Sequence, residues 1–226
     1  MAVAVLLPLS FYLVVNKMSK GKIVVPGHYG VEKVEKTTRD GKEVMDTIYH
    51  QVSDISLINQ MGQKVSLKKD LDGKMVVIDF FFIDCPSVCP KLSTNMRFLQ
   101  NSFRKDPKKE NTLENDVQFL SITVLPERDS FQRIRVYADK YGANHDHWWF
   151  LTGDKKSIYA FARNELGLST GPGDGGADDF IHTEKIVLLD KDHYIRGYYN
   201  GLSDTSANKC ANDIVLLTLE RKHNKK

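Results

Sequence analysis

Two cysteines four positions apart are the side chains of this sequence best suited to chemistry. Cys85 and Cys89 lie in the segment Asp-Cys-Pro-Ser-Val-Cys-Pro, residues 84–90. A dense run of β-branched and aromatic residues precedes the segment and a helical pattern follows it, so we expect the pair where a buried strand ends and a helix begins. Helix N-termini carry exposed N–H groups and partial positive charge, which stabilise thiolate over thiol. We therefore predict that the pKa of both cysteines is lowered.

The spacing of the pair is compatible with two kinds of chemistry. Residues four apart on a helix are separated by about 6 Å along its axis, within the range of roughly 4.4 to 6.8 Å between Cα atoms over which a disulfide closes. The pair can therefore hold one soft metal ion or oxidise to a disulfide. Structural zinc needs four ligands, usually as two close pairs, and the third cysteine, Cys210, is remote. We interpret Cys210 as a small buried hydrophobic residue near the start of the last helix.

The third ligand of such a metal site would come from a histidine. Two thiolates suit Cu(I), and an added imidazole makes a trigonal site that also holds Cu(II). His182 is the candidate, because it lies between a loop rich in Gly and Asp (residues 170–179) and a predicted core strand, so that the loop could carry it onto the cysteines. A polar residue that caps the start of a strand explains His182 equally well. His145 and His147 form a competing pair, for which we favour exposure at the surface.

Alternating strand and helix patterns position these residues. A DG turn predicts a first hairpin, and Met61-Gly62 a second. The run 74–83 has the composition of a strand buried on both faces, and Pro90 suits the first position of the helix that follows. The order indicates an α/β fold, a mixed central sheet flanked by helices with an extra N-terminal β-hairpin. The expected hairpins are 31–52, 55–66 and 185–199, the other strands 74–83, 116–124 and 148–153, and the helices 90–103, 130–141, 155–166 and 210–222.

Length and charge restrict the class of protein. The 226 residues, 41% of them hydrophobic, suit one domain of ordinary size with an N-terminal appendage. A net charge of +3 without a clustered basic stripe argues against a nucleic-acid binder. The apolar run that ends at Asn16 is shorter than the roughly 20 residues of a membrane helix. It fits a signal-peptide core or part of a membrane anchor, with a buried segment of the domain as the alternative. We expect a signal or anchor segment (1–16), a linker (17–30) and one domain (31–226).

The sequence resembles the Sco/SenC family of copper chaperones from about residue 55 to 219. The similar segments are Val-Val-Ile-Asp-Phe-Phe-Phe-Ile-Asp-Cys-Pro-Ser-Val-Cys-Pro (76–90), Pro-Glu-Arg-Asp (126–129), Phe-Leu-Thr-Gly (150–153), and His-Thr (182–183) before Ile-Val-Leu-Leu-Asp (186–190). The resemblance implies a thioredoxin-like fold and copper held by the residues that match Cys85, Cys89 and His182. It also implies a membrane-tethered protein whose domain faces the periplasm, or the mitochondrial intermembrane space, and which serves the dinuclear copper centre in subunit II of cytochrome c oxidase.

Two positions depart from the family pattern. Leu125 and Ile181 stand where the family usually has acidic residues, so a carboxylate that supports the site would have to come from Glu127 or Asp129, or be missing. We expect a metal-transfer protein rather than an enzyme that turns over a substrate. The alternative is a thiol–disulfide oxidoreductase acting on the copper-ligand cysteines of the oxidase. Thioredoxin-type enzymes carry a proline beside the active cysteines, and this chain has none after Pro172, which weighs against general disulfide exchange.

Overall fold

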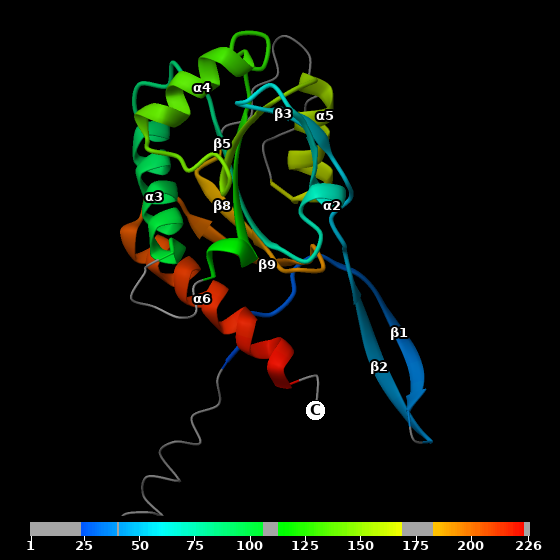
Figure 1. Ribbon diagram of the computed structural model, residues 1–226. Helices are drawn as coiled ribbons and strands as arrows, with labels where there is room; N and C mark the ends of the chain where they lie inside the picture. Colours follow the sequence, from blue (N-terminus) through cyan, green and yellow to red (C-terminus); the bar gives the residue numbers. More distant parts are fainter. Residues whose placement is uncertain (1–23, 40, 106–112, 169–182, 224–226) are drawn as a thin grey trace, which may run out of the picture.

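A mixed seven-stranded sheet forms the centre of the computed structural model, which describes residues 24–39, 41–105, 113–168 and 183–223 (Figure 1). Its strand order is β4-β3-β7-β6-β5-β8-β9. Strands β5, β6 and β7 are parallel, whereas β3 runs antiparallel to β7 and β8 antiparallel to β5. The predicted α/β class is therefore confirmed. The strands are β3 (Ser56–Asn59), β4 (Lys64–Ser66), β5 (Met75–Phe81), β6 (Val117–Thr123), β7 (Trp148–Thr152), β8 (Lys185–Leu189) and β9 (Ile195–Asn200).

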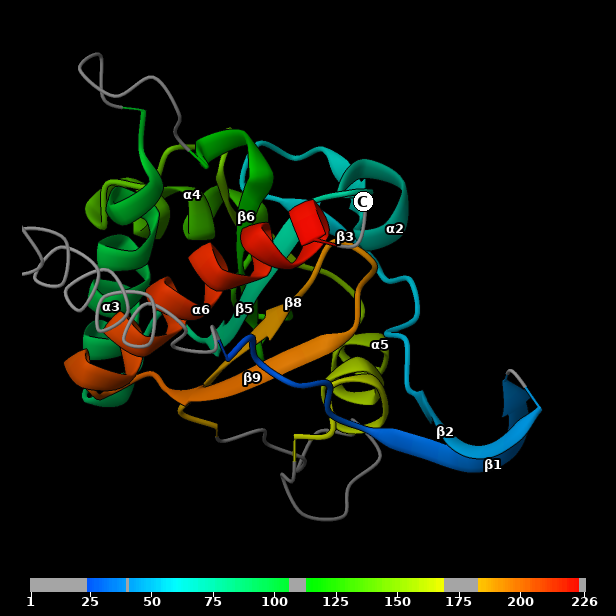
Figure 2. The ribbon, with the colours of Figure 1, turned by 90° about the horizontal axis from the view of Figure 1, so that it is seen from below.

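Helices cover both faces of this sheet (Figures 1 and 2). One face packs against α3, α4 and α6, and the other against α2 and α5. Strand β5 lies between them with all seven residues buried, as its composition predicts. The helical elements are α2 (Leu67–Asp70), α3 (Val88–Phe103), η1 (Glu114–Asp116), α4 (Phe131–Lys140), α5 (Lys155–Ala160), the π-helical turn η2 (Phe161–Glu165) and α6 (Asp204–His223).

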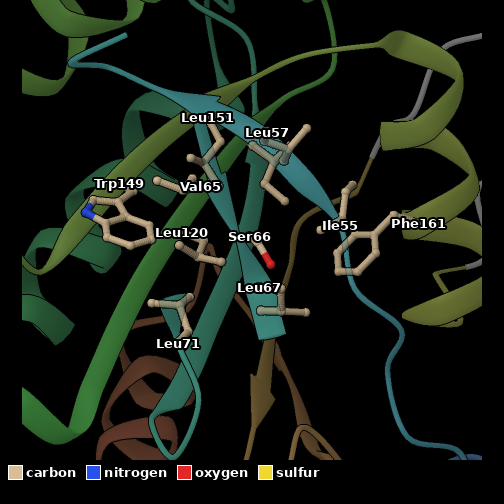
Figure 3. Close-up of a pocket in the computed structure, with 11 residues that line it drawn as sticks. Ile55, Leu57, Val65, Ser66, Leu67, Leu71, Leu120, Trp149, Leu151 and Phe161 are labelled. Carbon is tan, nitrogen blue, oxygen red and sulfur yellow. The ribbon is translucent and has the colours of Figure 1, made fainter. Parts of the chain in front are cut away.

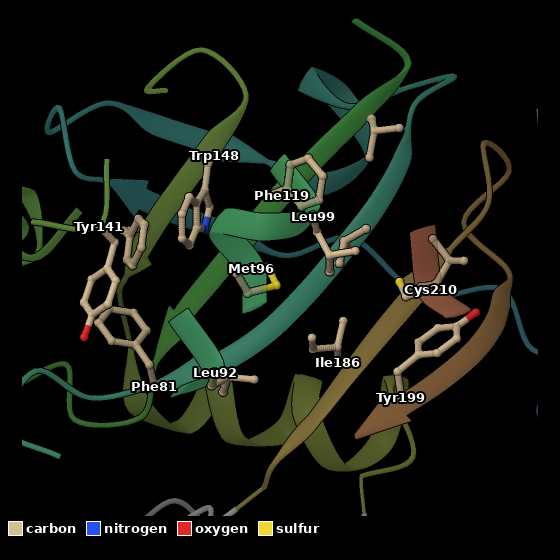
Figure 4. Packing of buried hydrophobic residues seen from close by; sticks show 14 of the residues in the cluster. Phe81, Leu92, Met96, Leu99, Phe119, Tyr141, Trp148, Ile186, Tyr199 and Cys210 are labelled. Atoms are coloured by element: carbon tan, nitrogen blue, oxygen red, sulfur yellow. The ribbon is translucent and has the colours of Figure 1, made fainter. Parts of the chain in front are cut away.

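Each face of the sheet has its own apolar core. In Figure 4, the α3 side chains Leu92, Met96 and Leu99 lie among aromatic rings of the sheet, and Cys210 of α6 lies beside Tyr199. The core on the other face surrounds a cavity of about 10 Å³ (Figure 3). Burial on both sides leaves β5 little freedom to shift, so the end of this strand is a rigid platform for the cysteine segment. The cavity is lined by Ile55, Leu57, Val65, Ser66, Leu67, Leu71, Leu120, Ile122, Trp149, Leu151 and Phe161.

Two helix boundaries differ from those predicted. Helix α3 begins at Val88, so Pro90 occupies its third position rather than its first. The N–H groups of a first helical turn have no intrahelical partner, so proline costs no hydrogen bond at this position. Helix α6 begins at Asp204, six residues before Cys210. Ser203 caps it by accepting a hydrogen bond from the Ser206 N–H at 3.3 Å, which places Cys210 fully buried inside the helix rather than near its start.

The predicted first hairpin forms a separate two-stranded sheet, β1 (Val31–Arg39) and β2 (Lys42–Tyr49), which extends away from the domain as an arm (Figure 1). Gly41 lies in its turn with φ 74°. At the base of the arm, His50 Nδ1 lies 2.9 Å from Glu32 Oε1 and Nε2 lies 3.0 Å from Glu165 Oε2. The hydrogen bond to Glu32, with help from Glu165, raises the pKa of His50. His50 therefore joins the arm to the domain through two carboxyl groups that favour its protonated form.

The segment before the arm is attached to the domain. Arg196, which is buried in β9, donates from Nε and Nη2 to the Pro26 carbonyl and forms ion pairs with Asp190 at 2.8 Å and Glu220 at 2.9 Å. The part of the expected linker from residue 24 to 30 is therefore held by side chain and backbone contacts. The apolar run 2–15 lies outside the described residues, and among those described, no helix is long and apolar enough to span a bilayer.

Replacing Gly201 by alanine should destabilise the domain by about 1–3 kcal/mol, the usual cost of overpacking. A Cβ there would lie 2.0 Å from Leu92 Cδ1 on α3 and 2.8 Å from the Glu184 carbonyl oxygen. Urea denaturation measures the change. Gly27→Ala is the control, because nothing lies within 4 Å of its added Cβ. Equal stabilities of the two variants would contradict the tight approach of α3 to the β8–β9 pair.

The attachment of the arm through His50 should depend on pH. A raised histidine pKa contributes stability that is complete below the unfolded value of about 6.5 and is lost as pH rises through the folded pKa. The pKa of Glu165 is lowered, because hydrogen bonds from Ser53 and His50 outweigh its burial, so its share is lost as pH falls through that lowered value. Hydrogen-exchange protection of residues 31–49 should therefore fall as pH rises above neutral. His50→Gln should abolish this trend, whereas His145→Gln should not.

Candidate functional site

The cysteine segment lies where its composition predicts. Strand β5 ends at Phe81, Cys85 follows in the connecting turn with its N–H donating to the Phe82 carbonyl at 3.3 Å, and Cys89 is the second residue of α3. Both thiols are free and buried, with 9% and 5% of their surface exposed. The pair therefore lies at the C-terminal edge of the parallel strands, where ligands of α/β sheets bind.

The first turn of α3 stabilises a thiolate at Cys85. The Cys89 N–H donates to Cys85 Sγ at 3.3 Å. Burial alone would raise the pKa of Cys85, but hydrogen bonds from the Cys89 thiol and from the backbone N–H groups of Cys89, Ser87 and Val88 outweigh it. The pKa of Cys85 is therefore lowered, as predicted from its place at a helix N-terminus.

The prediction for Cys89 is wrong, because its pKa is raised to about 12. Burial is the largest cause, and the hydrogen bond that its thiol donates to Cys85 is the second. The negative charges of Cys85 and Asp79 also disfavour a second thiolate. The environment of the pair therefore favours a single thiolate, on Cys85, over two, and a proton on Cys89 makes the hydrogen bond between the two sulfurs.

A buried carboxyl group, which the sequence interpretation missed, lies on the face of β5 that packs against the cysteines and α3. Asp79 is fully buried; its Oδ1 accepts from Ser121 Oγ at 2.5 Å, and Trp148 Nε1 donates to the same hydroxyl at 2.9 Å. Its other oxygen has no hydrogen-bond partner among the described residues. Burial raises the pKa of Asp79 to about 7. The available signal was an acidic residue inside the apolar run 74–83.

Carboxylates also hold the turn that carries Cys85. Asp129 is buried, and its Oδ2 accepts from the Ile83 N–H at 3.2 Å and from Thr123 Oγ1 at 2.6 Å. Asp84 forms ion pairs with Arg128 at 3.0 Å and Arg133 at 3.4 Å. Asp129 therefore supplies a carboxylate to the cysteine turn in a chain that has Leu125 instead of the family's acidic residue.

The histidines whose side chains the structure describes lie at the edge of the sheet opposite the cysteines. His145 and His147 precede β7, which is parallel to β6 and, through it, to β5, so they lie at the edge where β5 begins. His145 contacts Gln60 and Asp139, each at 2.9 Å, and His147 lies 3.8 Å from Glu114. Both rings are partly exposed, so the expectation of surface exposure is met only in part. The other histidines with described side chains are His28, His50 and His193. They lie near the end of β8 or at the base of the arm.

His182 lies outside the described residues, but its neighbour Thr183 is described. Thr183 lines a cavity of about 10 Å³ together with Cys89, Val88, Val124 and the phenylalanines 80–82. Strand β8 runs antiparallel to β5 and begins at the cysteine edge, which explains this position. Within the described part of the chain, no three His, Cys, Asp or Glu side chains gather to hold a metal ion.

Alkylation should distinguish the two cysteines. With iodoacetamide, Cys85 should react first and its rate should reach a plateau at a lower pH than that of a free thiol, because its thiolate is stabilised. Cys89→Ala removes the donated thiol hydrogen bond and should move that profile to higher pH. Mass spectrometry after pulsed labelling measures both effects, with the buried Cys210 as an internal unreactive control. Faster labelling of Cys89 than of Cys85 would refute the assignment.

Comparison with known proteins identifies the family. The SCO1/SenC family model matches residues 44–217. The SCO1 protein homolog of Bacillus subtilis is 31% identical over 175 residues, covering 77% of this chain and 86% of the relative. BsSco, a member of the Sco family of cytochrome c oxidase assembly proteins in which a disulfide switch was identified, superposes with a TM-score of 0.61 at 31% identity, and ScoI of Bradyrhizobium japonicum with copper bound superposes with 0.55 at 25%. The alignments cover 75% and 73% of this chain and 95% and 97% of those structures. With a buried cysteine pair at the end of a central strand and this extent of similarity, the chain belongs to the SCO1/SenC family.

Proposed function

We propose that this protein binds one copper ion through Cys85, Cys89 and His182 and delivers it to subunit II of cytochrome c oxidase. The observation that carries the proposal is the position of Thr183, which lines the same cavity as Cys89. Because consecutive Cα atoms are 3.8 Å apart, we expect a side chain on the residue before Thr183 to come within reach of the cysteines. The histidines whose side chains the structure describes lie at the edge of the sheet far from the cysteines.

The donor set suits a soft ion that must later be released. Two thiolates favour Cu(I), and an imidazole added to them extends the site to Cu(II). Hydrogen bonds lower the pKa of Cys85, whereas Cys89 must lose a proton that it holds with a pKa of about 12. Copper binding therefore releases a proton. The same proton competes with copper, so its return to Cys89 assists transfer to an acceptor.

The relatives support the identity of the cargo and of its destination. A copper-bound ScoI and an oxidase assembly protein are among the structures similar to this chain. We extend these properties to this protein, and we place the domain at a membrane, facing the periplasm or, in a eukaryote, the mitochondrial intermembrane space. The apolar run that ends at Asn16 supports a membrane anchor or export signal.

A thiol–disulfide exchange reaction on the copper-ligand cysteines of the oxidase is the second candidate function. The observation in its favour is the inequality of the two thiols. A low-pKa Cys85 can attack a disulfide in a partner, and Cys89, which is hydrogen-bonded to it, can then resolve the mixed disulfide. Oxidation of the pair and reduction of the partner balance each other. This activity requires no third ligand, so His182 separates the two functions.

Copper titration of the reduced full chain, in competition with a chromophoric Cu(I) chelator, tests the proposal. We expect one Cu(I) per chain, with an affinity that increases with pH as the proton of Cys89 is lost. Cys85→Ser, Cys89→Ser and His182→Ala should each weaken binding at least as much as loss of a residue that only supports a ligand, which typically costs about 10–100-fold. Cys210→Ala and His145→Ala are the controls and should leave the affinity unchanged.

The result for His182→Ala decides between the two functions. Unchanged copper affinity in this variant, together with rapid reduction of a disulfide-bonded peptide by the wild-type chain, would remove the copper-transfer proposal in favour of the oxidoreductase. Weakened copper binding with slow peptide reduction would support copper transfer.

A further inference from the structure

The arm formed by β1 and β2 has unused capacity for strand pairing. Its strands are nine and eight residues long and, in the part of the chain that is described, pair only with each other. A lone two-stranded sheet is marginally stable in water, and each open edge presents unpaired N–H and C=O groups. Four apolar side chains on the arm are 41–60% exposed, namely Val31, Val34, Val44 and Met45.

The outer edge of β1 is complementary to itself. When two copies of this strand run antiparallel with Val34 opposite Val34, Lys33 of each copy faces Glu35 of the other. One step further out, Glu32 faces Lys36, although Glu32 also contacts His50 at 2.9 Å and belongs to an irregularity in the β1–β2 register. Opposite charges across a strand pair stabilise it and like charges destabilise it. This register therefore opposes unlike charges in both halves of the pair.

Twofold symmetry limits the possible registers, and repulsion between like charges disfavours most of those that remain. Antiparallel strands alternate hydrogen-bonded and non-hydrogen-bonded pairs. A twofold axis between two identical strands must therefore pass midway between a residue and the same residue of the other copy. Centring on Lys33, Glu35 or Lys36 would place identical charges in direct opposition. Centring on Thr37 leaves only the contact of Glu35 with Arg39 as an opposite-charge pair.

The charges that meet in this register are already ordered on each copy. Lys33 Nζ lies 2.5 Å from Glu35 Oε1 of its own strand, and Lys36 Nζ lies 3.7 Å from Glu43 Oε2. Pairing of two arms would therefore join two Lys33–Glu35 pairs into one cluster of alternating charge. The β2 edge is less suited, because its only symmetric opposite-charge contact joins Lys42 to Asp46.

We propose that two copies of this chain associate through the outer edge of β1, antiparallel and with Val34 opposite itself. The product is a continuous sheet in the order β2–β1–β1–β2. Two strand edges bury less than the roughly 1,200 Å² of a stable interface, so the dimer is weak and reversible. The proposal concerns β1, which precedes the residues matched by the family model, and is independent of copper binding.

Charge exchange between two variants tests the pairing. Lys33→Glu places a second carboxylate opposite Glu35, and Glu35→Lys places a second ammonium group opposite Lys33. Each variant alone should therefore dimerise about tenfold more weakly than the wild type in sedimentation velocity runs at increasing concentration. Mixed in equal amounts, the two variants regain opposite charges at both contacts and should form a heterodimer. Lys42→Glu on β2 is the matched control and should dimerise like the wild type.

Cysteine cross-linking tests the register. Cα atoms of facing residues lie about 4.5–5.5 Å apart, within the range that a disulfide closes. Under mild oxidation, Val34→Cys should yield a covalent dimer, and Thr37→Cys should not. A wild-type chain that stays monomeric at every concentration overturns the proposal, as does a dimer that is indifferent to both charge variants or that cross-links through position 37.

Discussion

The chemistry of the site depends on a hydrogen-bonded pair of sulfur atoms at the start of α3. Cys85 receives the Cys89 N–H and the Cys89 thiol, and the first turn of the helix adds two more N–H groups. This arrangement requires the helix to begin at Val88. A helix beginning at Pro90 would not turn the N–H groups of residues 88 and 89 toward Cys85. It also requires β5 to be held from both sides, because a shift of the strand would carry the turn at Cys85 away from the helix.

Burial makes the two sulfurs unequal, and Asp79 adds to this inequality. Its carboxylate, with one oxygen lacking a partner among the described residues, disfavours negative charge on Cys89. Because the pKa of Asp79 is about 7, the group changes its charge near neutral pH. The pKa of Cys89 therefore depends both on Cys85 and on a carboxyl group of the buried strand. Metal binding and disulfide formation both remove the proton of Cys89, so the charges that raise the pKa of this thiol oppose both reactions.

Local patterns in the sequence were sufficient for the sheet and for the cysteine pair. The density of β-branched residues in β5 and the DG turn of the arm predict these elements, because both signals arise within a few residues. The pKa of Cys89 was mispredicted because the helix dipole is a local effect, whereas burial and Asp79 are not. His145 is half-buried because Gln60, far away in sequence, bonds to it. The start of α6 was missed because its cap, Ser203, lies in a polar stretch without periodicity. His182 as a ligand stays a prediction.

The arm and the cysteines lie at opposite edges of the domain, and this separation makes the two proposals compatible. Gln51, just after the arm, forms a bridge with Tyr194, which follows β8. Since β8 is antiparallel to β5, that end of β8 lies beside the start of β5, whereas the cysteines follow its end. Pairing of two arms through β1 would therefore leave the cysteine edge of each copy open to a client. If both proposals hold, copper would enter and leave at one edge, and contacts between copies would be confined to the other.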